Sequence, residues 1–140
     1  YGCGVYQNAV NYPEELFHKF LESKFDLSLL QNSSSRKPAT VGFSQVFNRY
    51  SYIDFGMMNE NFMSWGCEDV ELYYRMSCLG YKIGRIPNDL YHLEHARTFN
   101  SHYNNPKFND NNNLWEWFRR QNKETIRNYY NKQEYLKQRL

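Results

Sequence analysis

Two adjacent carboxylates, Glu68 and Asp69, follow the aromatic-glycine pair Trp65-Gly66 with one residue between. The helical pattern begins at Glu68, so the free N–H groups and the helix dipole would stabilise both acids as anions. The alternative interpretation is that both are ordinary first-turn acids of a solvated helix. The preceding aromatic residue and flexible glycine favour a position at the rim of an aromatic-walled cleft. There Asp69 could take a proton from a hydroxyl nucleophile, and Glu68 could accept hydrogen bonds from sugar hydroxyls.

A second candidate site contains two histidines, His92 and His95, with Glu94 between them. Residues three apart in an extended segment point to opposite faces, so both bind one metal ion only if the chain bends between them. A metal site and two structural histidines both remain open. A hard ion such as Mn²⁺ or Mg²⁺ would want an additional carboxylate, and the sequence has no Asp-x-Asp pair to supply one.

The three cysteines do not extend either site. Cys67 stands beside two acids, which disfavour a thiolate, so we do not expect a nucleophile there. Cys67 and Cys78 straddle one predicted helix and are not expected to pair with each other. The odd number of cysteines, with no zinc-binding spacing, favours a reducing compartment over a secreted one.

Composition predicts one domain with a modest, aromatic-rich core, since the 140 residues are 41% hydrophobic and 19% aromatic. Some Tyr and Trp should remain to line a groove, where flat apolar faces with polar tips suit sugars and nucleotides. A net charge of +2 is too weak for a nucleic-acid-binding protein, which needs a clustered basic face. No segment has the length of a membrane span or the pattern of a signal peptide. Because the chain begins with Tyr, we expect a fragment of a longer protein.

The elements that would position these residues can be placed along the chain. Irregular chain is predicted for residues 1–12, a helix for 13–24, a polar loop for 31–40, a strand or strand edge for 41–47, and a short helix or turn for 48–54. A helix is predicted for residues 68–79, with Gly80 in the left-handed position that ends it. One side of that helix is defined by four residues, with Met76 and Leu79 close to it: Val70, Tyr73, Tyr74 and Ser77.

Beyond that helix the pattern weakens. Strands are predicted at residues 81–86 and 90–94, the second delivering His95. The Asn-rich stretch 97–113 has no period and predicts a long loop. A long polar helix is then expected from residue 114 to about 138.

A set of short motifs resembles the C-terminal half of a GT-A glycosyltransferase over about residues 40–97. The similarity is to β-1,4-galactosyltransferases and to bacterial family-2 galactosyl- and N-acetylgalactosaminyltransferases of the chondroitin-polymerase kind. The segment Trp-Gly-Cys-Glu-Asp-Val-Glu-Leu at residues 65–72 is its most specific part. The supporting motifs are Gly42-Phe43-Ser44, Phe55-Gly56, Asn59-Glu60-Asn61-Phe62, Arg75, Gly80-Tyr81 and His92-Leu93-Glu94-His95.

The resemblance implies a role for each site residue. Asp69 matches the catalytic base of the inverting members, and Glu68 matches an acid that binds the acceptor or donor sugar. Trp65 matches the aromatic on which sugar rings and donor phosphates rest, and Gly66 belongs to the same substrate-binding turn. His95 matches a histidine that binds Mn²⁺, and His92 falls where a further metal ligand is placed.

The resemblance also implies an architecture and partners. The expected fold is α/β (α+β), a partial GT-A nucleotide-sugar transferase fold with a mixed sheet, flanking helices and no N-terminal nucleotide-binding half. Residues 1–113 would form the acceptor and catalytic part, with a lid-like loop at about 97–113, and residues 114–140 a helical extension. The substrates would be a UDP-sugar donor and a glycan acceptor, with Mn²⁺ or Mg²⁺ as cofactor and the missing N-terminal half of the same enzyme as partner. The isolated fragment would be weakly active or inactive.

Small departures from the family pattern occur at Ser64 and Cys67, where Gly is frequent. Two other classes of protein stay open. One is a non-catalytic carbohydrate-binding module. The other is a retaining transferase of the polypeptide N-acetylgalactosaminyl type, which the presence of Asp69 after Glu68 disfavours. The Asn, Tyr and Lys content suggests a bacterial protein of surface-polysaccharide synthesis. We expect a cytoplasmic location. The alternative is the inner face of the membrane, with which the parent protein would associate.

Overall fold

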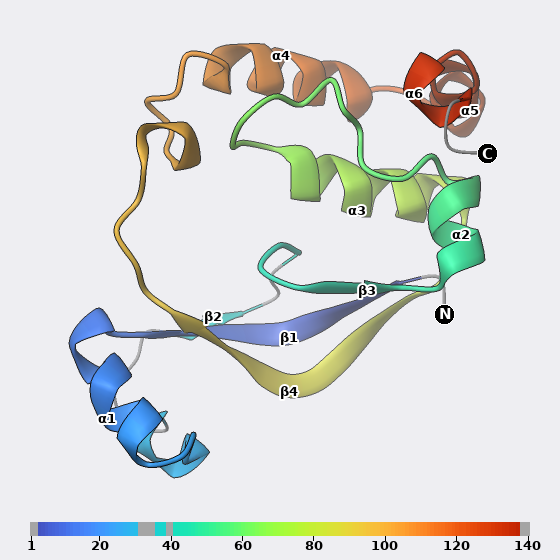
Figure 1. The fold of residues 1–140 in the computed structure, drawn as a ribbon. Coiled ribbons are helices and arrows are strands. Elements are labelled where there is room, and N and C mark those ends of the chain that lie inside the picture. Colours follow the sequence, from blue (N-terminus) through green and yellow to red (C-terminus); the bar gives the residue numbers. More distant parts are fainter. Residues whose placement is uncertain (1–2, 31–35, 39–40, 138–140) are drawn as a thin grey trace. The chain divides into compact units, whose positions relative to one another are not determined.

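The computed structural model describes residues 3–30, 36–38 and 41–137, and it has a mixed α/β architecture (Figure 1). The chain divides into two compact units. The sheet unit comprises Val5–Gln45 and Arg85–Ala96, and the helical unit comprises Tyr1–Gly4, Val46–Gly84 and Arg97–Leu140. Each unit is described by itself.

The sheet has four strands, β1 (Cys3–Tyr12), β2 (Arg36–Pro38), β3 (Gln45–Phe47) and β4 (Ile83–Leu93). Its order is β2-β1-β3, and β4 also pairs with β1. β1 and β2 are antiparallel, with Asn8 opposite Pro38 and Val10 opposite Arg36. β4 runs in the same direction as β1, which makes the sheet mixed, as the resemblance implied (Figure 1).

β1 corrects the prediction of irregular chain over residues 1–12. Val5 and Ala9 are buried on one face of the strand, and Val10 and Tyr12 are buried on the other. A strand buried on both faces loses the alternation of apolar and polar residues that marks a half-exposed strand. The sequence pattern therefore gave no strand signal.

β4 is one strand where two were predicted, at residues 81–86 and 90–94. It continues through Pro87, which lacks an N–H group to donate to a neighbouring strand. In the described part of the chain β4 pairs with β1 alone, and an edge strand of this kind tolerates proline.

The helix predicted from Pro13 is present as a 3₁₀ turn, Glu14–Leu16, followed by α1 (Phe17–Glu22). A second 3₁₀ turn covers Leu27–Leu30. Phe20 packs edge-on against Tyr12 with ring centroids 5.8 Å apart, and three partly buried residues join them: Leu16, Tyr91 and Leu93. The polar loop predicted for residues 31–40 lies outside the described residues except at β2.

The helical unit contains α2 (Arg49–Asp54), α3 (Glu68–Leu79), a 3₁₀ turn (Phe99–Ser101), α4 (Phe108–Phe118), α5 (Lys123–Asn131) and α6 (Glu134–Lys137). The short helix predicted at residues 48–54 is confirmed, with the Asn48 side chain accepting a hydrogen bond from the Ser51 N–H. The helix predicted at residues 68–79 is also confirmed. Gly80 ends it in the left-handed conformation, with φ 88°.

The buried face of α3 carries an ion pair. The four residues predicted to define one side of this helix are not its buried face, since Val70 and Ser77 are exposed and Tyr73 and Tyr74 are half-buried. The buried face consists of Met76 and Leu79, predicted close to that side, together with Glu71, Leu72 and Arg75. Arg75 Nε lies 2.9 Å from Glu71 Oε1, and both side chains are almost completely buried. Burial of two charges is tolerated when they are paired and hydrogen-bonded.

The remaining donors and acceptors of this pair are used by neighbouring elements. Arg75 donates to the carbonyls of Phe55 (2.7 Å) and Met57 (2.8 Å), and the Tyr130 hydroxyl donates to Glu71 (2.9 Å). The guanidinium also lies 3.9 Å from the centre of the Tyr130 ring. The pair therefore joins α3 to the turn after α2 and to α5.

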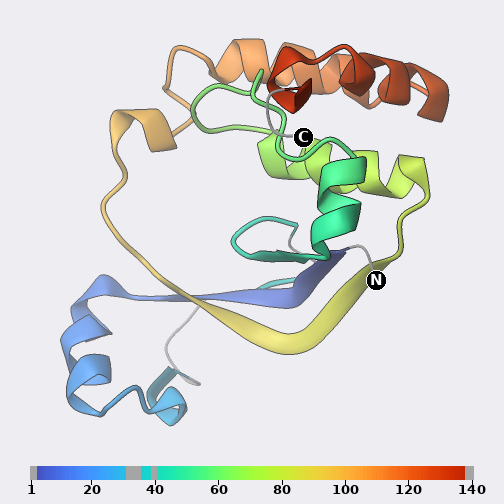
Figure 2. The same cartoon turned by 45° about the vertical axis from the view of Figure 1, so that its right-hand side comes forward.

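The segment after residue 97 corrects two predictions. The predicted loop 97–113 ends earlier, because α4 begins at Phe108, and the single predicted helix 114–138 is instead α4, α5 and α6 (Figure 2). Asn is a weak helix former, but Asn111 is buried in α4 with its amide satisfied by other parts of the chain. The Asn122 side chain accepts from the Thr125 N–H (2.9 Å) and starts α5.

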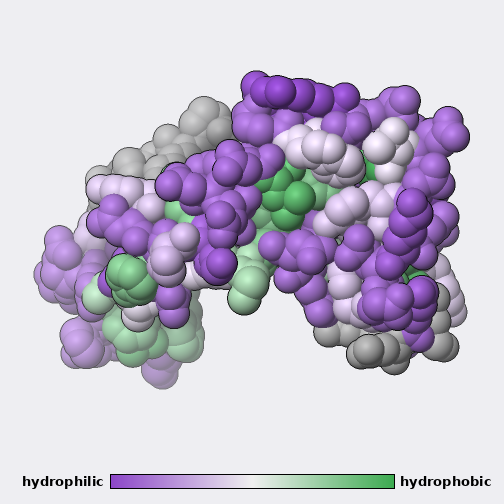
Figure 3. Space-filling view, turned by 90° about the horizontal axis from the view of Figure 1, so that it is seen from above, coloured by the Kyte–Doolittle hydropathy of each residue, from purple (hydrophilic) through white to green (hydrophobic). Residues whose placement is uncertain are grey.

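Hydrophilic side chains cover much of the face shown in Figure 3. Within the described ranges, the helices are too short and too polar for any of them to cross a membrane.

Candidate active site

A tight turn precedes α3 and carries Trp65 and Gly66. Three of its residues have left-handed backbones: Ser64 (φ 65°), Gly66 (φ 132°) and Cys67 (φ 67°). Gly adopts this conformation without strain, whereas each other residue costs about 1 kcal/mol or more. The turn therefore needs contacts from elsewhere in the chain to hold it.

Asparagine residues from the following segment supply these contacts. The Asn111 side chain accepts from the Met63 N–H (3.2 Å) and donates to the Met63 carbonyl (2.9 Å). The Asn105 side chain donates to the Trp65 carbonyl (2.9 Å). The backbone carbonyl of Asn100 accepts from the Trp65 N–H (3.2 Å) and the Ser64 hydroxyl (2.8 Å). The turn is thus held by three asparagines of the segment that follows α3 and β4.

The indole of Trp65 is positioned by Phe108, the first residue of α4. The two rings stack with centroids 5.8 Å apart and planes 9° apart. Trp65 remains 39% exposed, which leaves part of the indole available to a ligand. A role for this flat apolar surface in binding a sugar ring stays a prediction.

Glu68 closes the turn from the helix side. Its Oε2 accepts a hydrogen bond from the Gly66 N–H at 2.7 Å. The Cys67 thiol donates to Asn112 Oδ1 (3.1 Å), and burial, together with Glu68 and Glu116, raises its pKa. A protonated, hydrogen-bonded thiol agrees with the expectation that Cys67 is no nucleophile.

Asp69 stands in the first turn of α3, partly buried. Burial, and to a smaller extent the negative charge of Glu68, together raise the pKa of its carboxyl to about 6. The helix N-terminus opposes this effect by favouring the anion. A carboxyl that titrates near pH 6 is ionised at neutral pH and still basic enough to accept a proton.

His92 and His95 lie in the sheet unit. β4 ends at Leu93, between the two histidines, and their imidazole rings lie 5.8 Å apart, centre to centre. His92 Nδ1 is buried, has no hydrogen-bond partner among the described residues, and lies 4.0 Å from Glu94 Oε1. The ring of Phe43 packs edge-on against His92 at 4.9 Å. The two imidazoles therefore lie near each other, although a spacing of three residues in an extended segment predicts opposite faces.

The structure brings Trp65, Gly66, Glu68 and Asp69 together in the helical unit, and it brings the two histidines together in the sheet unit. Within the residues that the structure covers, no group of three or more His, Cys, Asp or Glu side chains is arranged to hold a metal ion. Sequence reasoning missed Asn105, Phe108 and Asn111. Their stretch was noted only as Asn-rich, and nothing in it indicates which amides turn inward.

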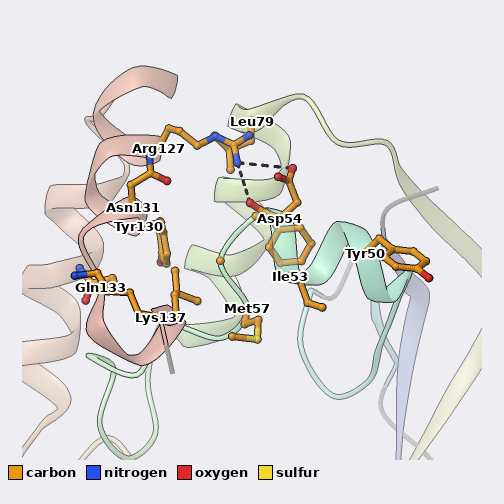
Figure 4. A pocket seen from close by; sticks show the side chains of 13 residues that line it. Tyr50, Ile53, Asp54, Met57, Leu79, Arg127, Tyr130, Asn131, Gln133 and Lys137 are labelled. Carbon is orange, nitrogen blue, oxygen red and sulfur yellow. Dashed lines mark hydrogen bonds and ion pairs between the residues drawn. The ribbon is translucent and has the colours of Figure 1, made fainter. Parts of the chain in front are cut away.

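A cavity of about 690 Å³ lies elsewhere in the helical unit, between α2 and the α5–α6 segment (Figure 4). Its wall includes Ile53, Met57, Leu79 and Tyr130, and its rim carries the ion pair of Arg127 with Asp54 (3.7 Å). Leu79 and Asp69 are ten residues apart on α3, which corresponds to about 15 Å along the helix axis. This cavity is therefore separate from the Asp69 region.

Residues 32–99, just under half of the chain, match the family model described as the N-terminal domain of galactosyltransferase. The match supports a galactosyltransferase-like glycosyltransferase domain, and it contains all six predicted site residues. Its description names an N-terminal domain, whereas the resemblance in the sequence motifs is to a C-terminal half. Searches of the curated proteins and of the solved structures found no match.

Proposed function

We propose that the protein transfers a hexose of the galactose or N-acetylgalactosamine type from a UDP-sugar to a glycan acceptor, with inversion at the anomeric carbon. The observation that carries the proposal is Asp69, a carboxyl with a pKa of about 6 that follows the partly exposed Trp65 by four residues, inside the segment that matches a galactosyltransferase family. A general base of this pKa suits a hydroxyl nucleophile at neutral pH.

In the proposed reaction Asp69 accepts the proton of an acceptor hydroxyl. The oxygen forms a bond to the anomeric carbon from the face opposite the diphosphate, and the bond to the diphosphate oxygen breaks, so that UDP leaves with the electron pair. Trp65 supports the sugar ring through its exposed face. Glu68 uses Oε2 to hold Gly66, and its other oxygen would accept from a sugar hydroxyl.

A divalent ion, Mn²⁺ or Mg²⁺, would be held by His92 and His95. The unpartnered, buried Nδ1 of His92 and the closeness of the two rings fit such an ion. The donor diphosphate and further groups of the enzyme would complete its coordination. Once bound, the ion would supply positive charge that stabilises the leaving diphosphate.

The segment 97–107 is proposed to serve as the lid that excludes water from the donor. Its contacts with the Trp65 turn through Asn100 and Asn105 support this role. Exclusion of water would favour transfer over hydrolysis of the UDP-sugar.

The test is UDP release by the full-length protein from UDP-galactose or UDP-N-acetylgalactosamine, with MnCl₂ and saccharide acceptors. Asp69→Asn should lower turnover by about 10²–10⁴-fold, the usual contribution of a general base, while the Kd for the UDP-sugar stays unchanged. Asp110→Asn is the matched control, because its carboxylate is exposed on α4 and pairs with Lys107 at 3.1 Å.

Unchanged turnover in Asp69→Asn would reject the assignment of the base. Glycan binding without any transfer by the wild-type protein would instead favour a carbohydrate-binding module. Retention of configuration in the product, read by NMR of the anomeric proton, would reject inversion and favour a retaining transferase.

A further inference from the structure

We propose that Asn111, assisted by Asn105, is a positioning residue of the transferase site, which holds the turn at residues 63–67 in the conformation that presents Trp65 and Asp69. The catalytic role in this inference rests on the proposed function. The hydrogen bonds that hold the turn do not, and they all lie within the helical unit.

Asn111 uses both ends of its amide on the turn. Its side-chain oxygen accepts from the Met63 N–H, and its nitrogen donates to the Met63 carbonyl (2.9 Å) and at 3.4 Å to the Trp65 carbonyl. The residue is 1% exposed, so water cannot replace these bonds. A buried backbone group that loses such a partner costs about 1–3 kcal/mol.

Asn105 donates a second hydrogen bond to the Trp65 carbonyl. Its nitrogen donates to the carbonyls of Trp65 (2.9 Å) and His102 (2.7 Å), and its oxygen accepts from the Lys107 N–H (2.9 Å). At 4% exposure it is also buried. The Trp65 carbonyl therefore receives two side-chain donors, while Gly66 N–H is held by Glu68 from the other side.

The need for these contacts comes from the backbone of the turn. Ser64 and Cys67 both adopt left-handed conformations that a free chain would leave. Cys67 immediately precedes α3, so a change in its φ would redirect the first turn of the helix, including Asp69. A relaxed turn would also admit water to the partly buried carboxyl.

The experiment compares Asn111→Ala with Asn113→Ala in the 140-residue chain. Asn113 is exposed on the same helix, so both changes have the same effect on helix propensity. The Asp69 carboxyl is titrated by ¹³C NMR, and amide exchange is followed at Met63 and Trp65. In Asn111→Ala the pKa of Asp69 should fall from about 6 toward its ordinary value of 3.8. Amide exchange at the turn should accelerate by roughly 5–150-fold, as a loss of 1–3 kcal/mol implies. Asn113→Ala should change neither.

An Asn111→Ala chain that stays folded with an unchanged Asp69 titration and unchanged exchange would overturn the proposal. If this variant does not fold, Asn105→Ala carries the test with the same two readouts, since it removes one donor from Trp65 and leaves Met63 bonded. In the full-length enzyme, kcat should fall about 10-fold or more with the donor KM little changed. Because the NMR readouts need no activity, a shifted titration in a protein that transfers no sugar would reject the function and support the positioning contact.

Discussion

The indole of Trp65 lies parallel to the ring of Phe108, 43 positions later in the sequence. Gly66 fits beneath the same ring so closely that an added Cβ would lie 2.9 Å from Phe108 Cδ2. α4, which the sequence did not predict at this position, thus forms one side of the turn that carries the site.

Gly66→Ala should therefore be much more damaging than Gly80→Ala, although both glycines have positive φ angles (132° and 88°). A Cβ at Gly80 meets nothing closer than Lys123 Nζ at 4.0 Å, so only the left-handed strain of about 1–2 kcal/mol applies. At Gly66 overpacking against Phe108 adds about 1–3 kcal/mol. Urea unfolding of the two variants measures the difference. Equal losses of stability would show that the contact with Phe108 is not limiting.

The rate of transfer should depend on pH through Asp69. As the pH falls through about 6 the carboxylate is protonated and the base is lost, so kcat/KM should fall about tenfold per pH unit below that value. The rate should level off above pH 7. A pH–rate profile in the presence of saturating metal measures this. An acid limb near pH 4 would mean that Asp69 is fully hydrated or is not the base.

The raised pKa of Asp69 also predicts a stability effect with a definite sign. Between pH 4 and pH 6 the native state binds more protons at this carboxyl than the unfolded state, so stability falls as the pH rises through this window. Asp69→Asn should consequently stabilise the chain at pH 7, by on the order of 1 kcal/mol once solvent screening is allowed for. Thermal unfolding at pH 7 and pH 4 tests this, because the gain should vanish at the lower pH. A gain of equal size at both values would point to a cause other than titration.

Arg75→Met should strongly destabilise the helical unit. It leaves Glu71 buried without its cation, and removal of one partner of a buried pair costs about 3–5 kcal/mol. Arg120→Met is the control, because Arg120 forms an exposed i,i+4 pair with Glu116 at 3.1 Å, for which a loss of under about 1 kcal/mol is typical. Both are measured by urea unfolding. The double change Glu71→Gln with Arg75→Met should recover part of the loss, and no recovery would contradict the role given to the uncompensated charge.

Local sequence determined the elements whose signals are local. The bounds of α3, its left-handed end at Gly80 and the start of α2 at Asn48 follow from periodicity and capping residues, which act within one or two turns of chain. The two acids after Trp65-Gly66 were recognisable for the same reason. Their residue types and spacing predict the proposed chemistry, and they lie in the segment that matches the galactosyltransferase family.

Tertiary structure decided what depends on partners distant in sequence. β1 lacks an alternating pattern because both of its faces are buried. Glu71 and Arg75 are buried because each satisfies the other and because Tyr130, Phe55 and Met57 complete their hydrogen bonds. The inward amides of Asn105 and Asn111 look in sequence like any other Asn. Only the folded chain brings them to the strained turn before α3, where buried backbone groups need partners.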